Sequence, residues 1–223
     1  MTDERNIVGK LSCQYDDKPI IQALLQLIPG WGAADTLLQR RADEIRSERI
    51  FTFFEELASG TQSLTQELIQ EEDFLHSYFC TLRAVINTRR REKIKLFAKL
   101  LDSSIDPVFS VSPDEYEELL SILDEISLRE FNALYKLMKF EVSNPIQKDQ
   151  SILQNAKEYW EQYRNSITEE IGIPLESFNA FMAKTERTGL YTRITGMYWD
   201  YSGDIGKTTT LLSRLIALLK LQD

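Results

Sequence analysis

Residues 112–130 read Ser112-Pro113-Asp114-Glu115-Tyr116-Glu117-Glu118-Leu119-Leu120-Ser121-Ile122-Leu123-Asp124-Glu125-Ile126-Ser127-Leu128-Arg129-Glu130. Ser112 supplies a capping hydroxyl, Pro113 takes the first helical position, and Glu115 completes a capping box. Ser127 and Glu130 repeat the box further along. The segment therefore predicts two consecutive helices on either side of Ser127, and it favours a mainly α protein.

Helical periodicity continues on the N-terminal side of this segment. Apolar residues recur at helical spacing from 33 to 58, and Ser59-Gly60 ends that helix. A second pattern predicts one long helix from Phe74 to Leu101. We therefore expect a flexible N-terminus at 1–18 and a helical bundle over 19–106.

Residues 19–38 are the most apolar part of the chain. Polar residues interrupt the run, and Pro29-Gly30 is expected to break any helix midway. We expect a short helix at 19–28, a turn and a second helix from Ala33. The favoured interpretation is a helix buried against the bundle. The alternatives are an apolar hairpin that enters a membrane after a conformational change and a surface that binds a partner.

The C-terminal part, 112–223, combines helices with one short β segment. After the helix that starts at Leu128, helical patterns cover 151–171 and 175–187. Gly189 suits a left-handed helix end, and residues 191–201 are rich in β-branched and aromatic side chains. An apolar helix closes the chain. This order predicts a winged-helix-like region that contains one small β-hairpin.

The segment Gly203-Asp204-Ile205-Gly206-Lys207-Thr208-Thr209-Thr210 resembles a phosphate-binding loop. Such a loop requires a glycine at position 201, where this chain has Tyr201. It also lies between a strand and a helix near the start of a domain, whereas this chain ends at Asp223. We interpret the segment as a turn, a returning strand and the entry to the last helix, with Lys207 on the surface of a wing.

Composition limits the functions that the chain can have. The 223 residues carry a formal net charge of −9, so nucleic acid or anionic lipid would bind only at a local basic patch. The single histidine, His76, must serve in any Cys-His or Ser-His mechanism. Cys13 and Cys80 lack the spacing of a zinc site. We expect no metal, no cofactor and no enzymatic activity.

The N-terminal residues, Met1 to Asn6, carry acidic side chains and lack the apolar core of a secretion signal. The two cysteines form no recognisable disulfide pattern. We therefore expect a cytoplasmic protein with reduced thiols.

Charge is segregated along the chain. Residues 83–99 hold seven cations and one acid, whereas residues 112–130 hold seven acids and one cation. The two stretches could pack side by side and neutralise each other, or the basic stretch could bind phosphates or an acidic partner. On a continuous helix, Arg89, Arg90 and Arg91 would point about 100° apart and could not face one ligand.

The candidate interaction surface collects the cations of both parts: Arg89, Arg90, Arg91, Lys93, Lys95, Lys184, Arg187, Arg193 and Lys207. In the C-terminal part, Lys184 and Arg187 lie on the helix that would read DNA, but Glu186 opposes them. We therefore favour a winged helix that contacts protein, or one that is structural, over one that binds DNA.

A resemblance rests on three motifs: Arg49-Ile50-x-x-Phe53-Phe54-x-x-Leu57, Glu72-Asp73-Phe74 and Arg89-x-Arg91-Glu92-Lys93-Ile94-x-x-Phe97-Ala98-x-Leu100-Leu101. They resemble a group of uncharacterised bacterial and phage-borne helical proteins in which a similar bundle precedes a winged-helix-like part. The resemblance implies a role near mobile elements or in phage defence, and it carries no catalytic residue.

These observations together favour a non-catalytic interaction or adaptor protein that binds a protein partner or a second copy of itself. One alternative is a DNA-binding regulator that uses the C-terminal winged helix. Another is a membrane-acting effector that uses the apolar hairpin at 19–38. Nucleic acid and membrane are the less favoured partners, since the chain is acidic overall.

Overall fold

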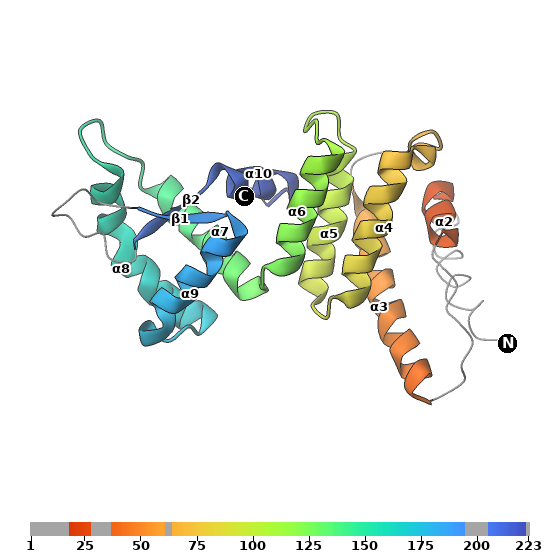
Figure 1. The fold of residues 1–223 in the computed structure, drawn as a ribbon, viewed down its shortest axis with the longest axis horizontal. Coiled ribbons are helices and arrows are strands. Elements are labelled where there is room, and N and C mark those ends of the chain that lie inside the picture. Colours follow the sequence, from red (N-terminus) through yellow and green to blue (C-terminus); the bar gives the residue numbers. More distant parts are fainter. Residues whose placement is uncertain (1–17, 28–36, 61–63, 195–204, 222–223) are drawn as a thin grey trace. The chain divides into compact units, whose positions relative to one another are not determined.

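The computed structural model describes residues 18–27, 37–60, 64–194 and 205–221 (Figure 1). Over these residues the protein is mainly helical, with one small antiparallel β-hairpin near the C-terminus. This confirms the fold class that residues 112–130 predict. The helix expected at 19–28 is present as α2, and the flexible N-terminus expected at 1–18 lies almost wholly outside the described residues.

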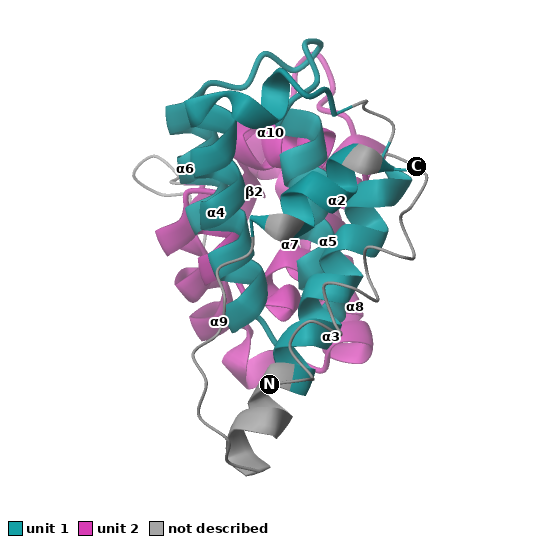
Figure 2. Cartoon of the chain, turned by 90° about the vertical axis from the view of Figure 1, so that its right-hand side faces the viewer, with its two compact units in different colours: residues 1–121 teal, residues 122–223 magenta. Residues whose placement is uncertain are grey.

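The chain forms two compact units, Met1–Ser121 and Ile122–Asp223 (Figure 2). The division falls within helix α6 (Pro113–Glu125) and not in the connection at 107–111, where the sequence places it. The first half of α6 belongs with the first unit because the hydroxyls of Tyr116 and Thr81 share a buried hydrogen bond. Local sequence patterns mark helix ends, and they do not show which unit a helix packs in.

The helices of unit 1 before α6 are α2 (Pro19–Gln26), α3 (Leu37–Ser59), η1 (Leu68–Gln70), α4 (Glu72–Asn87) and α5 (Arg91–Ser104). Figure 1 shows α4, α5 and the first part of α6 side by side, and α3 packs against α4 and α5. Phe53, Phe54, Tyr78 and Phe97 are fully buried. Large aromatic side chains of this kind contribute strongly to a core because each removes a large apolar area from water.

The apolar helix α2 packs into unit 1. Its Ile21, Leu24 and Leu25 side chains are buried, and the Tyr78 hydroxyl donates a 2.7 Å hydrogen bond to the Leu24 carbonyl. The favoured interpretation of this segment, a helix buried against the bundle, therefore holds for α2. The turn expected between residue 28 and Ala33, and the expected start of the second helix at Ala33, lie outside the described residues. Among the described helices, none has the length and apolar character needed to cross a membrane.

The single helix predicted from Phe74 to Leu101 is wrong, because the chain breaks between α4 and α5. Thr88 and Arg90 adopt extended backbone, with ψ of 128° and 120°. Arg49, on α3, donates a hydrogen bond to the Ile86 carbonyl at the end of α4. This bond from α3 satisfies a carbonyl at the end of α4. The break allows α5 to run back alongside α4.

After the end of α6, unit 2 contains α7 (Leu128–Ser143) and α8 (Ile152–Ile171), each opened by a complete capping box. It continues with η2 (Leu175–Ser177), α9 (Phe178–Thr185), η3 (Glu186–Thr188), β1 (Tyr191–Arg193), β2 (Gly206–Thr208) and α10 (Thr210–Leu218). Gly189 has φ of 70°, as its predicted role at a left-handed helix end requires. The Ser127–Glu130 box is likewise confirmed.

An aromatic cluster forms the centre of unit 2. Tyr163 is fully buried, and its ring lies 5.3 Å from Trp160 and 5.8 Å from Phe178 between ring centroids. Phe140, on α7, adds a further ring to the cluster, with its centroid 5.8 Å from that of Tyr163. Edge-to-face arrangements of this kind stabilise a core beyond the area that they bury.

The hairpin pairs Tyr191 with Thr208 and Arg193 with Gly206. Thr208 donates two hydrogen bonds to the Glu141 carboxylate at the end of α7, one of them a 2.8 Å bond from its backbone amide. Thr209 then caps α10. The returning strand and the helix entry expected within residues 203–210 are therefore confirmed, whereas the turn expected before them lies outside the described residues.

Candidate interaction surface

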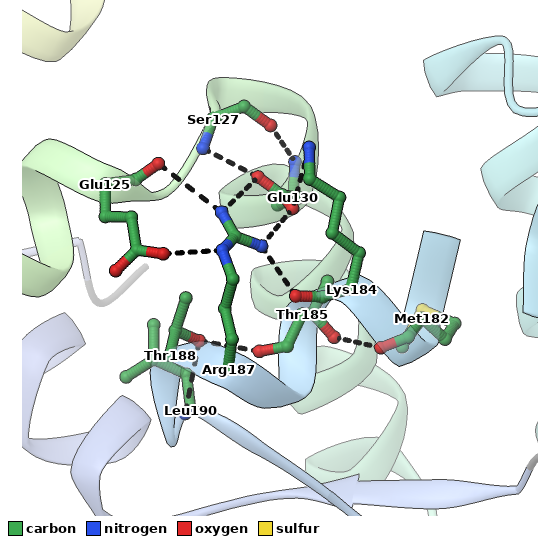
Figure 3. A network of polar contacts seen from close by, with 9 residues as sticks. All are labelled: Glu125, Ser127, Glu130, Met182, Lys184, Thr185, Arg187, Thr188 and Leu190. Atoms are coloured by element: carbon green, nitrogen blue, oxygen red, sulfur yellow. Dashed lines mark hydrogen bonds and ion pairs between the residues drawn. The ribbon is translucent and has the colours of Figure 1, made fainter. Parts of the chain in front are cut away.

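Arg187 lies between two carboxylates in unit 2 (Figure 3). Its Nε donates to Glu125 Oε1 at 2.6 Å, and its Nη1 donates to Glu130 Oε1 at 2.7 Å. Its Nη2 donates to the second Glu130 oxygen at 3.4 Å. Because these bonds use the nitrogens of the guanidinium fork, Arg187 holds α9 and η3 against the start of α7.

Glu130 is the buried member of this network, with 1 % of its side chain exposed. Its carboxylate also accepts the Ser127 amide at 2.8 Å, and Lys184 Nζ lies 3.6 Å away. Burial disfavours the charged form, but the hydrogen bonds from Arg187 and Ser127 outweigh it and lower the pKa of Glu130 to about 2. Arg187 therefore serves the internal structure of unit 2, and Lys184 adds a weaker, exposed contact to the same carboxylate.

The Glu130 network predicts a pH dependence of stability. The pKa of Glu130 falls from the usual 4.5 to about 2 on folding, so its contribution is present above pH 4.5 and lost as the pH falls towards 2. We expect the free energy of urea unfolding to lose about 1–3 kcal/mol over this window through Glu130. Glu130→Gln, which cannot titrate, should lack this part of the dependence. An identical dependence in both proteins would contradict the assignment.

The two remaining predicted cations of unit 2 also lie near carboxylates. Arg193 Nε pairs with Glu186 Oε1 at 3.1 Å. Lys207, on β2, is half-buried, and its charge acts on Glu141. Burial raises the pKa of Glu141, while the Thr208 hydrogen bonds and the Lys207 charge oppose that rise. The unit 2 cations thus have neighbours of opposite charge within their own unit.

The predicted cations of unit 1 fall into two groups. Lys95 Nζ lies 3.4 Å from Glu56 on α3, and Lys99 Nζ shares the same carboxylate at 4.0 Å. Lys93 is half-buried, with its Nζ 5.9 Å from the centre of the Phe97 ring. These lysines lie along α5 and interact with their own unit.

Arg89, Arg90 and Arg91 form the second group, which we call the arginine cluster. All three are exposed: Arg89 and Arg90 lie in the break between α4 and α5, and Arg91 is the first residue of α5. Among the described residues none of the three side chains has an ion-pair partner. The break removes the constraint of a continuous helix that would turn them about 100° apart.

Three ion pairs of unit 1 bear on the segregated charge. Lys95 and Lys99 pair with Glu56 on α3, while Glu117 on α6 pairs with His76 at 2.9 Å. At these three positions, residues of the basic and acidic stretches pair with α3 and α4.

Cys80, His76 and Glu117 converge on the surface of α4 and α6. Cys80 Sγ lies 3.5 Å from His76 Nε2, and Glu117 Oε1 lies 2.9 Å from the same nitrogen. A catalytic triad holds its histidine by one ring nitrogen and uses the other as the base, so this arrangement lacks that geometry. Within the described part of the chain, no group of three His, Cys, Asp or Glu side chains could hold a metal ion.

The sequence could show part of this arrangement. The spacing of His76 and Cys80 is one helical turn, so their contact follows from helix geometry. Arg49 and the carboxylate partners of Arg187 could not be found in this way, because they come from distant segments.

No protein-family model, curated protein or solved structure matches this chain.

Proposed function

We propose that this chain is a non-catalytic interaction or adaptor protein that binds an acidic protein partner through the arginine cluster. The observation that carries the proposal is three consecutive exposed arginines without an ion-pair partner among the described residues, in a chain of net charge −9. Guanidinium groups bind carboxylates in a bidentate manner, which makes an acidic protein segment a fitting ligand.

The other candidate functions have less support. One observation supports a DNA-binding regulator: in unit 2 three α-helices precede a hairpin and a further helix, the order on which the prediction of a winged-helix-like region rests. However, Lys184 and Arg187 are held by Glu130, and α9 presents the uncharged Asn179 and Ala180 to solvent. A membrane-acting effector would have to withdraw α2, whose Ile21, Leu24 and Leu25 side chains are buried.

The proposal predicts charge-dependent binding of an acidic peptide. A fluorescein-labelled peptide of Glu, Asp and Ser residues is titrated with the full chain, and fluorescence anisotropy reports the Kd. We expect Arg89→Gln/Arg90→Gln/Arg91→Gln to weaken binding about tenfold or more, since each exposed ion pair contributes up to about 1 kcal/mol. Added salt should weaken binding of the wild type.

A matched control removes lysines that already have a partner. Lys95→Gln/Lys99→Gln removes two charges from the same unit, and we expect the Kd to change little because Glu56 occupies both. Equal binding by the wild type and the triple arginine variant would overturn the proposal. Tighter binding of a DNA duplex than of the peptide, at the same salt concentration, would favour the DNA-binding alternative.

The setting in which such an interaction acts is a separate proposal. The resemblance described above implies phage defence or mobile elements, and it is carried by structural motifs alone. The genes beside the one that encodes this chain would test it: neighbours with defence or transposition roles would support the setting, and unrelated metabolic neighbours would count against it.

A further inference from the structure

Helix α4 exposes one continuous face of unit 1. The face consists of residues three or four positions apart, all of them exposed: Glu72, His76, Phe79, Arg83 and Asn87. On this face, His76 forms an ion pair with Glu117 of α6. Phe79 remains 40 % exposed, and Arg83, one turn further on, has no ion-pair partner among the described residues.

The face leads from an apolar side chain towards the arginine cluster. With a rise of about 1.5 Å per residue, Arg83 lies about 6 Å and Asn87 about 12 Å along the helix from Phe79. Arg89, Arg90 and Arg91 follow where α4 ends. A ligand that lies along α4 therefore meets an aromatic ring first and guanidinium groups after it.

The ring of Phe79 lies beside the ring of its neighbour Tyr78. Its ring centroid lies 5.5 Å from that of the fully buried Tyr78, whose hydroxyl is bound to α2. A single exposed apolar residue is ordinary on a protein surface. This one differs because it shares a helix face with Arg83, and aromatic and arginine side chains together dominate the energetics of protein interfaces.

We infer that the partner contacts α4 through an amphipathic acidic segment, with an apolar side chain on Phe79 and carboxylates on Arg83 and the arginine cluster. This inference rests on the proposed function and adds the chemistry and the order of the contacts. Charge complementarity selects the acidic groups, and the ring of Phe79 selects the apolar one. A ligand with charge alone would use the arginines and leave Phe79 uncovered.

The test compares two labelled peptides of equal negative charge. One carries a leucine about two helical turns before a run of acids, and the other has serine in place of the leucine. Wild-type full chain should bind the leucine peptide at least about fivefold more tightly. Phe79→Ala should abolish that difference and leave the affinity for the serine peptide unchanged.

Control variants keep each outcome interpretable. Val108→Ala removes a side chain of the same unit that is 84 % exposed, and it should change neither affinity. Phe79→Leu, which keeps an apolar group, should retain most of the difference. The thermal midpoint of each variant checks that the exposed substitutions leave the fold intact.

The possible results separate this inference from the proposed function. If Phe79→Ala leaves the preference for leucine unchanged, or wild type shows none, the inference is overturned while arginine-dependent binding can still hold. If the triple arginine variant binds both peptides like wild type, the proposed function itself fails. A labelled oligothymidylate that binds more tightly than either peptide, and loses affinity on Phe79→Ala, would overturn the inference in favour of base stacking.

Discussion

Replacing Arg187 with alanine is expected to lower the free energy of unfolding by about 3 kcal/mol, because the buried Glu130 carboxylate then loses its main partner. Breaking a buried pair from one side costs more than the pair contributes, since the remaining charge stays out of water. Lys184 is 3.6 Å away and 63 % exposed, so it cannot replace the bidentate guanidinium.

Urea unfolding followed by circular dichroism measures the effect. Lys184→Ala is the matched control, because it removes the weaker and exposed partner of the same carboxylate, and we expect a loss below about 1 kcal/mol. The double variant Glu130→Gln/Arg187→Ala should be less destabilised than the two single losses combined, since no buried charge is stranded. A loss from Arg187→Ala no larger than that from Lys184→Ala would show that Glu130 is not held as described.

Glu130 shows which contacts a sequence pattern can predict and which it cannot. Ser127 and Glu130 predict a capping box, and the structure contains it, because the bonds of a cap join residues three positions apart. The second role of Glu130, as the partner of Arg187, spans 57 positions. Interpreted locally, Arg187 is an available cation on a DNA-reading helix. Only the tertiary structure shows that Arg187 already forms ion pairs with Glu125 and Glu130.

The arginine cluster shows the opposite case. The sequence predicts Arg89, Arg90 and Arg91 as surface cations, and the structure leaves them exposed. Their arrangement could not be predicted, since residues 74–101 contain neither glycine nor proline to mark a helix end. The break depends in part on Arg49, 37 positions away, which bonds the last turn of α4. Residue type was therefore predictable and geometry was not.

The β-hairpin was predicted from composition and turn residues, but its attachment to the rest of unit 2 was not. Two strands of three residues have little stability by themselves. Glu141 binds Thr208 across 67 positions, and Tyr191 is buried against the strand that pairs with its own. Long-range contacts of this kind stabilise the short hairpin, and no local pattern records them.

Gly206→Ala is expected to destabilise the hairpin by about 2 kcal/mol, and the cause is the ring of Tyr191. A Cβ at position 206 would overlap Oη, Cζ and Cε2 of that ring. Tyr191 is buried, so the ring cannot move aside into solvent. Overpacking of a filled site costs about 1–3 kcal/mol, and the smaller backbone entropy of unfolded alanine offsets only part of it.

A double-mutant cycle tests this origin of the effect. In a Tyr191→Ala background the ring is absent, so Gly206→Ala should cost little there while the same change in wild type lowers the free energy of urea unfolding. Hydrogen exchange at the Thr208 amide reports the hairpin directly, because this amide donates to Glu141, and Gly206→Ala alone should accelerate it. An equal cost in both backgrounds would mean that backbone conformation requires glycine at this position. A smaller cost without Tyr191 shows that the glycine in the Gly-Lys-Thr sequence makes room for an aromatic ring.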